Sequence, residues 1–191
     1  MPVNDKVRTI DWLALARNPQ NWMWGFPLSI AIIAADQVSK TLVLAQSALN
    51  GLACRDGLLL CGAFQIVGPV FNDKPFFSIS MTWNRGVSFG ALQSEGAGRW
   101  LLFLLTGAIA AGFAVWLFKA VRPLTALSLS MVIGGAVGNL IDRAMHGAVV
   151  DFLDFSGLFF PWVFNIADAC ISVGAILLLL DQLLASRKSP G

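Results

Sequence analysis

Charged residues are scarce in this 191-residue chain, because Asp, Glu, Lys and Arg together make up 13% of it and the net charge is only +2. The positive charges are dispersed and form no basic stripe with interleaved aromatics, so the composition does not indicate a nucleic-acid partner. Histidine is rarer still, since His146 is the only one. A usual zinc site needs more nitrogen ligands than this, and we therefore expect no metal site and no cofactor.

Cysteine is also uncommon, with three residues and no CxxC spacing. Cys54 and Cys61 fall in one segment outside the apolar runs. They could form a disulfide if that segment faces an oxidising compartment, or remain free thiols, and the sequence favours neither. Cys170 lies within the last apolar run and is explained most simply as a small buried apolar residue.

Apolar sequence is abundant instead, with 57% hydrophobic residues and a mean hydropathy of +0.71. Four segments reach or approach the roughly 20 apolar residues that a helix needs to cross a hydrocarbon core. We expect an α-helical membrane protein that forms one domain over residues 1–191, built as a four-transmembrane-helix bundle. The expected spans are residues 24–45, 99–118, 124–143 and 161–184, and the segments outside them are 1–22, 47–97, 144–160 and 185–191.

The basic residues predict the orientation of the bundle. If four helices alternate, the Lys and Arg residues near the helix ends fall on one side, which marks that side as cytoplasmic and places both termini there. The basic leader over residues 1–22 is read as part of an uncleaved first anchor, because no small-residue cleavage site follows it. In a bacterium, segments 47–97 and 144–160 would then face the periplasm from the inner membrane. The residues counted are Lys6, Arg8, Arg17, Lys119, Arg122, Arg187 and Lys188.

The long segment 47–97 contains a strand pattern. Between residues 77 and 83, apolar side chains alternate with Ser78, Ser80 and Thr82, a period of two that is typical of a strand with one buried face. A small sheet on the membrane surface is therefore expected. A turn over residues 84–86 follows, after which Val87, Phe89 and Leu92 would dip towards the lipid as an interfacial loop.

Several polar residues lie within or beside the apolar runs. An ionised side chain inside a bilayer costs at least about 2.5–3.5 kcal/mol, so such carboxylates indicate function. Asp36 and Lys40 have i, i+4 spacing and predict a structural ion pair, with contact to a substrate headgroup as the second interpretation. Three residues share a face of the third helix, where Asp142 is expected to orient or neutralise Arg143. Asn165 and Asp168 are expected to share a face of the fourth helix. The third-helix residues are Asn139, Asp142 and Arg143.

These residues predict a catalytic pocket near one membrane interface. Two carboxyl groups held a few ångströms apart tend to share one proton, so that one can act as a general base on water and the other as a general acid. Such a pair hydrolyses an amide without a metal or a covalent intermediate. Asp151 and Asp168 are the candidate pair, and Asp154 is a weaker rival to Asp151. Asn139 and Asn165 could position a peptide carbonyl or a carboxylate.

Five sequence blocks follow one another between about Pro27 and Leu184. They are DQVSK (36–40), WNRGVSFGAL (83–92), GGAVGNLIDR (134–143), VVDFLDF (149–155) and FNIADACISVG (164–174). In this order they resemble the signal peptidase II (lipoprotein signal peptidase, prolipoprotein signal peptidase) family. The resemblance implies an inner-membrane aspartic endopeptidase with a periplasmic β-cradle, which removes signal peptides from diacylglyceryl-modified prolipoproteins just before the lipidated cysteine. It also implies inhibition by globomycin.

Carried over block by block, the resemblance makes Asp151 and Asp168 the catalytic dyad. The turn reads NRGVSF where an alanine-rich NxGAAF version is more usual, a departure that concerns the details of lipid fit. The expected partners are a lipid-modified prolipoprotein, membrane lipids and a globomycin-type inhibitor, with the protein acting as a monomer. The substrate-binding or site-supporting positions are Asp36, Lys40, Asn84, Gly86, Asn139, Asp142, Arg143 and Asn165.

Two other classes of function stay open at this point. Intramembrane carboxylates also form proton relays, so a small proton- or ion-coupled transporter is one alternative. Four helices without an internal repeat argue against it. The other alternative is a structural subunit whose polar cluster holds helices together.

Overall fold

The computed structural model describes residues 19–49, 70–71, 74–75, 77–85, 97–158, 160 and 162–186. Some sequence-based predictions therefore lie outside the described residues. These are the leader up to residue 18, the Cys54 and Cys61 pair, the turn at Gly86 and the apolar loop that carries Val87, Phe89 and Leu92.

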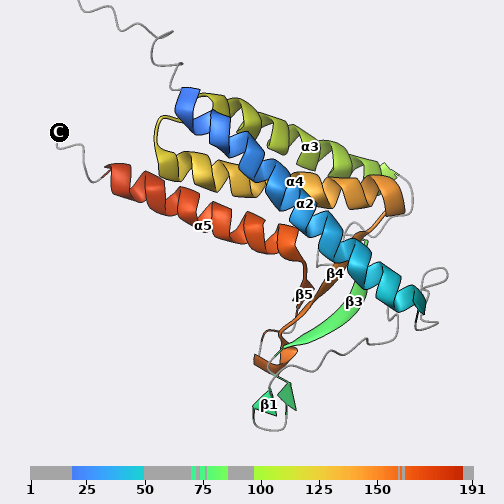
Figure 1. The fold of residues 1–191 in the computed structure, drawn as a ribbon. Helices are drawn as coiled ribbons and strands as arrows, with labels where there is room; N and C mark the ends of the chain where they lie inside the picture. Colours follow the sequence, from blue (N-terminus) through green and yellow to red (C-terminus); the bar gives the residue numbers. More distant parts are fainter. Residues whose placement is uncertain are drawn as a thin grey trace, which may run out of the picture.

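Four long helices make up most of the part of the chain that the structure describes: α2 (Pro19–Leu49), α3 (Ala97–Phe118), α4 (Pro123–His146) and α5 (Ile166–Ser186). Each is long and apolar enough to cross a membrane, over residues 21–45, 100–118, 123–146 and 166–186. The helices lie side by side, and α4 packs against each of the other three (Figure 1). The predicted four-helix bundle is confirmed.

The fourth helix begins later than the sequence suggested. We expected it to start at residue 161, but the structure starts it at Ile166, and Val163–Phe164 form strand β5 instead. These two residues pair with Leu153 and Asp154 of strand β4. Their backbone groups therefore belong to the sheet and are not available to extend the helix. The third helix runs past residue 143 to His146 and ends where Gly147 takes a left-handed conformation with φ 72°, as glycine does at many helix ends.

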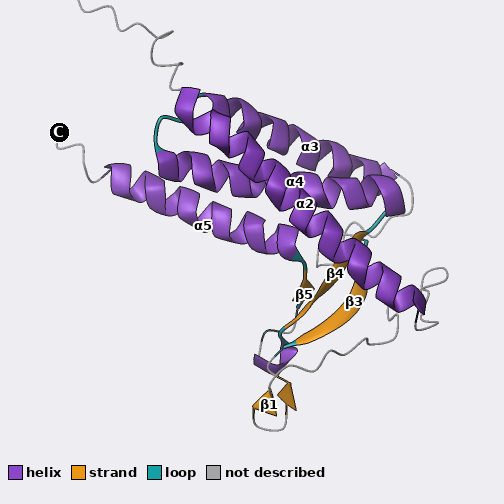
Figure 2. Cartoon of the chain, viewed as in Figure 1, coloured by secondary structure: helices purple, strands orange, loops and turns teal. Residues whose placement is uncertain are grey.

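The predicted small sheet is present. Strands β3 (Ser78–Asn84), β4 (Val149–Asp154) and β5 form a three-stranded antiparallel sheet in that order, while β1 (Val70–Phe71) and β2 (Lys74–Pro75) form a separate pair. A short 3-10 helix, Ser156–Leu158, follows β4. Strands β3, β4 and β5 lie at the end of the bundle where α4 finishes and α5 starts (Figure 2). Because β4 follows α4 directly and β5 precedes α5 directly, the sheet is fixed at this end.

The alternating burial predicted for β3 is wrong in detail. Ser78 and Met81 are its buried residues, rather than one continuous set of alternate positions. The cause is a register shift between Ile79 and Thr82, where three steps along β3 match two steps along β4. One extra residue in a strand turns the following side chains to the other face. Met81 consequently packs with Val150, Phe152 and Val43 of α2, which attaches the sheet to the bundle.

Candidate active site

The start of α5 is built by a reciprocal cap between Asn165 and Asp168. Oδ1 of Asn165 accepts a hydrogen bond from the backbone N–H of Asp168 at 2.8 Å, and Oδ2 of Asp168 accepts a longer one from the N–H of Asn165 at 3.4 Å. The backbone carbonyl of Asn165 accepts from Ala169. Asn165 is thus the residue before the helix, and not on the helical face where we had expected it. This cap holds the Asp168 carboxylate at the positive end of the helix dipole.

The second candidate acid, Asp151, comes from strand β4 and is buried. Its Oδ1 accepts a 2.8 Å hydrogen bond from Nδ2 of Asn165, and its Oδ2 accepts a 3.1 Å hydrogen bond from Nδ2 of Asn84 on β3. Asn165 therefore contacts both acids, through its side-chain amide to Asp151 and through its carbonyl oxygen to Asp168. The structure brings together the two carboxyl groups that the sequence singled out, from a strand and from a helix.

Asn139 of α4 completes the amide framework around the acids. Its Nδ2 donates to Oδ1 of Asp168 at 2.7 Å, and its Oδ1 accepts from Nδ2 of Asn165 at 3.2 Å. Nδ2 of Asn165 also donates to the backbone carbonyl of Val150 at 3.2 Å. Each acid is therefore held by amide donors, which fix the direction in which its oxygens point.

The environment of Asp151 changes its acidity. Burial and the negative charge of Asp168 raise the pKa of Asp151 to about 7. Hydrogen bonds from Asn84 and Asn165 and the positive charge of Lys40 act in the opposite direction, but they do not outweigh burial. A carboxyl group with this pKa holds a proton through part of the neutral range, as a general acid must.

A buried ionic cluster lies beneath the two acids. Nζ of Lys40 lies 2.7 Å from Oδ2 of Asp36 and 2.8 Å from Oδ2 of Asp142, and it donates to Oδ1 of Asn139 at 3.1 Å. Oδ1 of Asp36 accepts from the backbone N–H of Ala167 in the first turn of α5. The predicted Asp36–Lys40 pair is present and buried, and through Asn139 it is connected to Asp168.

The sequence predicts that Asp142 orients or neutralises Arg143; in the structure the charge of Asp142 acts on Arg143, but its ion pair and hydrogen bonds are made with other residues. Oδ2 of Asp142 interacts with Lys40 and also accepts from the backbone N–H of Val150 at 3.0 Å, so this carboxylate holds β4 against α4. Arg143 is partly buried and directs Nη1 to the backbone carbonyl of Asn139 at 3.3 Å. Neighbouring residues on a helix point about 100° apart, and Asp142 faces α2 as a result.

Comparison with known proteins identifies the family of this chain. The sequence profile of the signal peptidase (SPase) II family matches residues 28–184. The chain belongs to this family. It is 42% identical to the lipoprotein signal peptidase of Caulobacter vibrioides over 92% of this chain and 95% of the relative, and 42% identical to that of Methylobacterium radiotolerans over 75% and 81%. A solved bacterial membrane enzyme is 25% identical, with a TM-score of 0.65 over 87% of this chain and 92% of that one.

Membership of the signal peptidase II family makes the protein a multi-pass bacterial membrane peptidase that processes prolipoproteins. The transporter alternative finds no support in these relatives. The resemblance noted on five sequence blocks is therefore confirmed over most of the chain.

The structure separates Asp154 from the two acids of this signal peptidase II. Oδ2 of Asp154 accepts from Ser80 Oγ at 2.9 Å, and Oδ1 accepts from the backbone N–H of Ser156 at 2.9 Å. Partial burial acts to raise the pKa of Asp154, but the hydrogen bonds from Ser156 and Ser80 outweigh it and lower the pKa below its usual value. Asp154 is thus a carboxylate at neutral pH with partners of its own.

Two residues of structural importance were not singled out from the sequence. Nε2 of Gln37 lies within hydrogen-bond distance of Asp142 Oδ1, Gly138 O and Asp36 Oδ2, so it bridges α2 and α4 beside Lys40. A glutamine adjacent to Asp36 carries no pattern that would reveal this. Asp181 is buried in α5, and a lone carboxylate within an apolar run was a usable signal.

Proposed function

We propose that Asp151 and Asp168 are the catalytic dyad of this signal peptidase II, and that it cuts diacylglyceryl-modified prolipoproteins just before the lipidated cysteine. The observation that carries the proposal is the placement of two carboxyl groups around one amide, that of Asn165, at the end of a membrane-spanning bundle. A buried pair of this kind holds one proton between its members.

The chemistry assigns a role to each acid. Because the charge of Asp168 contributes to the raised pKa of Asp151, the resting pair has its proton on Asp151 and its charge on Asp168. Asp168 takes a proton from water as the water oxygen attacks the scissile carbonyl carbon, and Asp151 gives its proton to the carbonyl oxygen. The tetrahedral intermediate then collapses: Asp168 gives its proton to the leaving nitrogen, the C–N bond breaks, and a hydroxyl proton of the intermediate returns to Asp151 as the new carbonyl forms.

The surrounding residues support this reaction. Asn139 and Asn165 orient the acids, Asn84 fixes Asp151, and the cluster of Asp36, Lys40 and Asp142 holds the helix and strand that carry them. Arg143 is the partly buried cation of this end of the bundle and is suited to contact the substrate carbonyl or lipid headgroup. Gly86 lies outside the described residues and stays a predicted substrate-binding or site-supporting residue.

The proposal extends to the oligomeric state, the membrane orientation and the inhibition of the protein. The protein acts as a monomer in the inner membrane with both termini in the cytoplasm and the dyad near the periplasmic face. Globomycin is expected to inhibit it. Reporter fusions at the C-terminus test the orientation, since a reporter that works only in the periplasm should stay inactive there.

A gel-shift assay tests the dyad. Purified protein is mixed with a diacylglyceryl-modified prolipoprotein, and loss of the signal peptide is followed for the wild type, Asp151→Asn and Asp168→Asn. Each variant should lose cleavage by about 100-fold or more, because general acid–base catalysis typically contributes about 10²–10⁴-fold. Asp154→Asn, on the same strand, is the matched control and should cleave normally. Undiminished cleavage by either dyad variant would remove that residue from the mechanism.

A further inference from the structure

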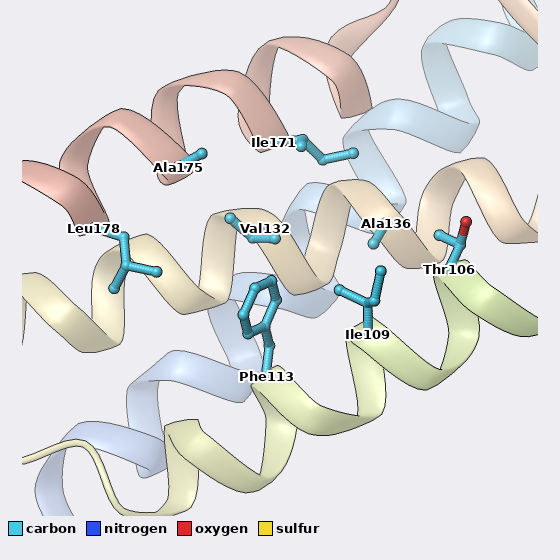
Figure 3. Close-up of a pocket in the computed structure, with 8 residues that line it drawn as sticks. All are labelled: Thr106, Ile109, Phe113, Val132, Ala136, Ile171, Ala175 and Leu178. Atoms are coloured by element: carbon cyan, nitrogen blue, oxygen red, sulfur yellow. The ribbon is translucent and has the colours of Figure 1, made fainter. Parts of the chain in front are cut away.

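An apolar groove runs along the bundle between α3 and α5, with α4 as its floor (Figure 3). Its volume is about 250 Å³. Ile109 on α3 is 49% exposed, and Ala175 on α5 is exposed as well, so the groove opens on the outer surface of the bundle. In a membrane-spanning bundle that surface faces lipid.

The groove follows the helix face that carries Asp168. On α5, its lining residues Ile171, Ala175 and Leu178 follow Asp168 at i+3, i+7 and i+10, which is a single stripe on one helix face. The first groove residue on this stripe therefore lies about one helical turn from Asp168.

On α4, which forms the floor of the groove, the lining residues also share a helix face with a residue that contacts the dyad. Ala136 and Val132 precede Asn139 at i−3 and i−7, again on one helix face. Since Nδ2 of Asn139 donates to Oδ1 of Asp168, both stripes start from the same hydrogen bond. At the other end of the groove lie Phe113 and Leu178, which pack against the buried core of the bundle.

We propose that this groove holds one acyl chain of the diacylglyceryl group of the substrate. The inference rests on the proposed function, because the lipidated cysteine is then next to the scissile bond. From Asp168 to Leu178 the helix rises about 15 Å, which is half of a hydrocarbon core about 30 Å thick. A chain attached beside the dyad would thus follow the groove through one leaflet.

The shape of the groove suits a linear acyl chain better than the other apolar part of the substrate. The helix of a signal peptide is about 10–12 Å wide with its side chains, whereas the α5 side of this groove is a single stripe of side chains. An ordinary phospholipid chain lacks the covalent link that would hold it at the depth of Asp168.

The groove should act by orienting the scissile bond of the substrate relative to the dyad, and not by adding much binding energy. An acyl chain gains little from leaving lipid for an apolar groove, because lipid is equally apolar. A chain laid along α5 would instead hold the scissile bond against the dyad, and misplacement by about 1 Å can cost about 100-fold in rate. The length of the acyl chain should therefore affect cleavage.

Groove-filling variants test this inference. Ala175→Phe fills the groove from α5, and Ile109→Trp fills it from α3 without touching the α4–α5 contact. Ala111→Phe is the matched control, because Ala111 is exposed on α3 and does not line the groove. Cleavage is measured in detergent with synthetic prolipoprotein peptides that carry dipalmitoylglyceryl or dihexanoylglyceryl groups. Hexanoyl chains are shorter than the rise of about 10 Å from Asp168 to Ala175.

Both groove-filling variants should lower kcat/KM about tenfold for the dipalmitoyl substrate and less than about twofold for the dihexanoyl substrate. Ala111→Phe should change neither value. Normal cleavage of the short-chain substrate shows that a variant is folded. Equal losses on both substrates, or no loss on either, would overturn the groove assignment while the wild type still cleaves. Failure of the wild type to cleave either substrate would overturn the proposed function, and this inference with it.

Discussion

The side-chain amide of Asn139 is locked in one orientation towards Asp168. Its Nδ2 donates to Oδ1 of Asp168 at 2.7 Å, while its Oδ1 accepts from Nζ of Lys40 at 3.1 Å and from Nδ2 of Asn165 at 3.2 Å. Lys40 has only donors, so a flipped amide would place N–H groups against an ammonium group. The buried lysine thereby fixes the donor that contacts Asp168.

Asn139→Asp tests this relationship, because it keeps the shape of the side chain and the acceptor for Lys40 but removes the donor to Asp168. A hydrogen bond to a charged group contributes about 1.5–3 kcal/mol, so kcat should fall by about 10- to 100-fold. Cleavage of the lipidated substrate gives kcat, and thermal unfolding shows whether the variant is folded. A folded variant with normal kcat would show that the donor has no role.

The pH dependence of cleavage should report the proton on Asp151. Because the pKa of Asp151 is raised to about 7, activity should decline as the pH rises through that value and the dyad loses its proton. Asn84 donates to the carboxylate form and lowers the pKa, so Asn84→Ala should move the alkaline decline to higher pH. Profiles of kcat/KM against pH measure the shift. An unchanged or lower midpoint in the variant would contradict this assignment.

Gly135 allows the close approach of α4 to the start of α5. A Cβ added there would overlap the backbone carbonyl oxygen of Ala167, which is fixed within the first turn of α5. Overpacking of this kind typically costs about 1–3 kcal/mol, so Gly135→Ala should lower the unfolding temperature and weaken cleavage. Gly112→Ala on α3 is the control, because a Cβ there meets no atom within 4 Å. Equal unfolding temperatures for the two variants would show that α4 and α5 can accommodate a methyl group at residue 135 without loss of stability.

Lys40 should matter for stability much more than an ion pair at the opposite end of the bundle. Lys40→Met leaves Asp36 and Asp142 buried without their cation, and breaking a buried pair in this way costs about 3–5 kcal/mol. Arg122→Met removes a guanidinium group that is 38% exposed and pairs with Asp181. That loss should be smaller, because only one acid loses its cation and Asp181 keeps the hydroxyl of Thr125 as a donor.

The two ion-pair variants should also differ in activity. Asp181 lies about 20 Å along α5 from Asp168, so Arg122→Met should cleave normally, while Lys40→Met should not. Chemical denaturation in detergent and the gel-shift assay compare them. Similar stability losses in both variants would mean that burial does not decide the strength of these pairs.

The four spans, the strand that ends at Asn84 and most polar residues of the site are predictable from local sequence. Length and hydrophobicity are local properties, and about 20 apolar residues in a row predict a membrane helix wherever its neighbours lie. The order of the five blocks likewise indicated the family without any knowledge of contacts. Asp151 and Asp168 were named as the candidate acids on these grounds.

Which polar groups meet depends on how the helices and strands pack together. Asp142 pairs with Lys40, about a hundred residues away, and not with the adjacent Arg143. Asn165 caps α5 from outside the helix, because β5 takes the residues before it. Hydrogen-bond partners depend on the direction and distance of side chains from different elements, and the close packing of α4 on α2 and α5 sets both. A linear pattern contains neither quantity.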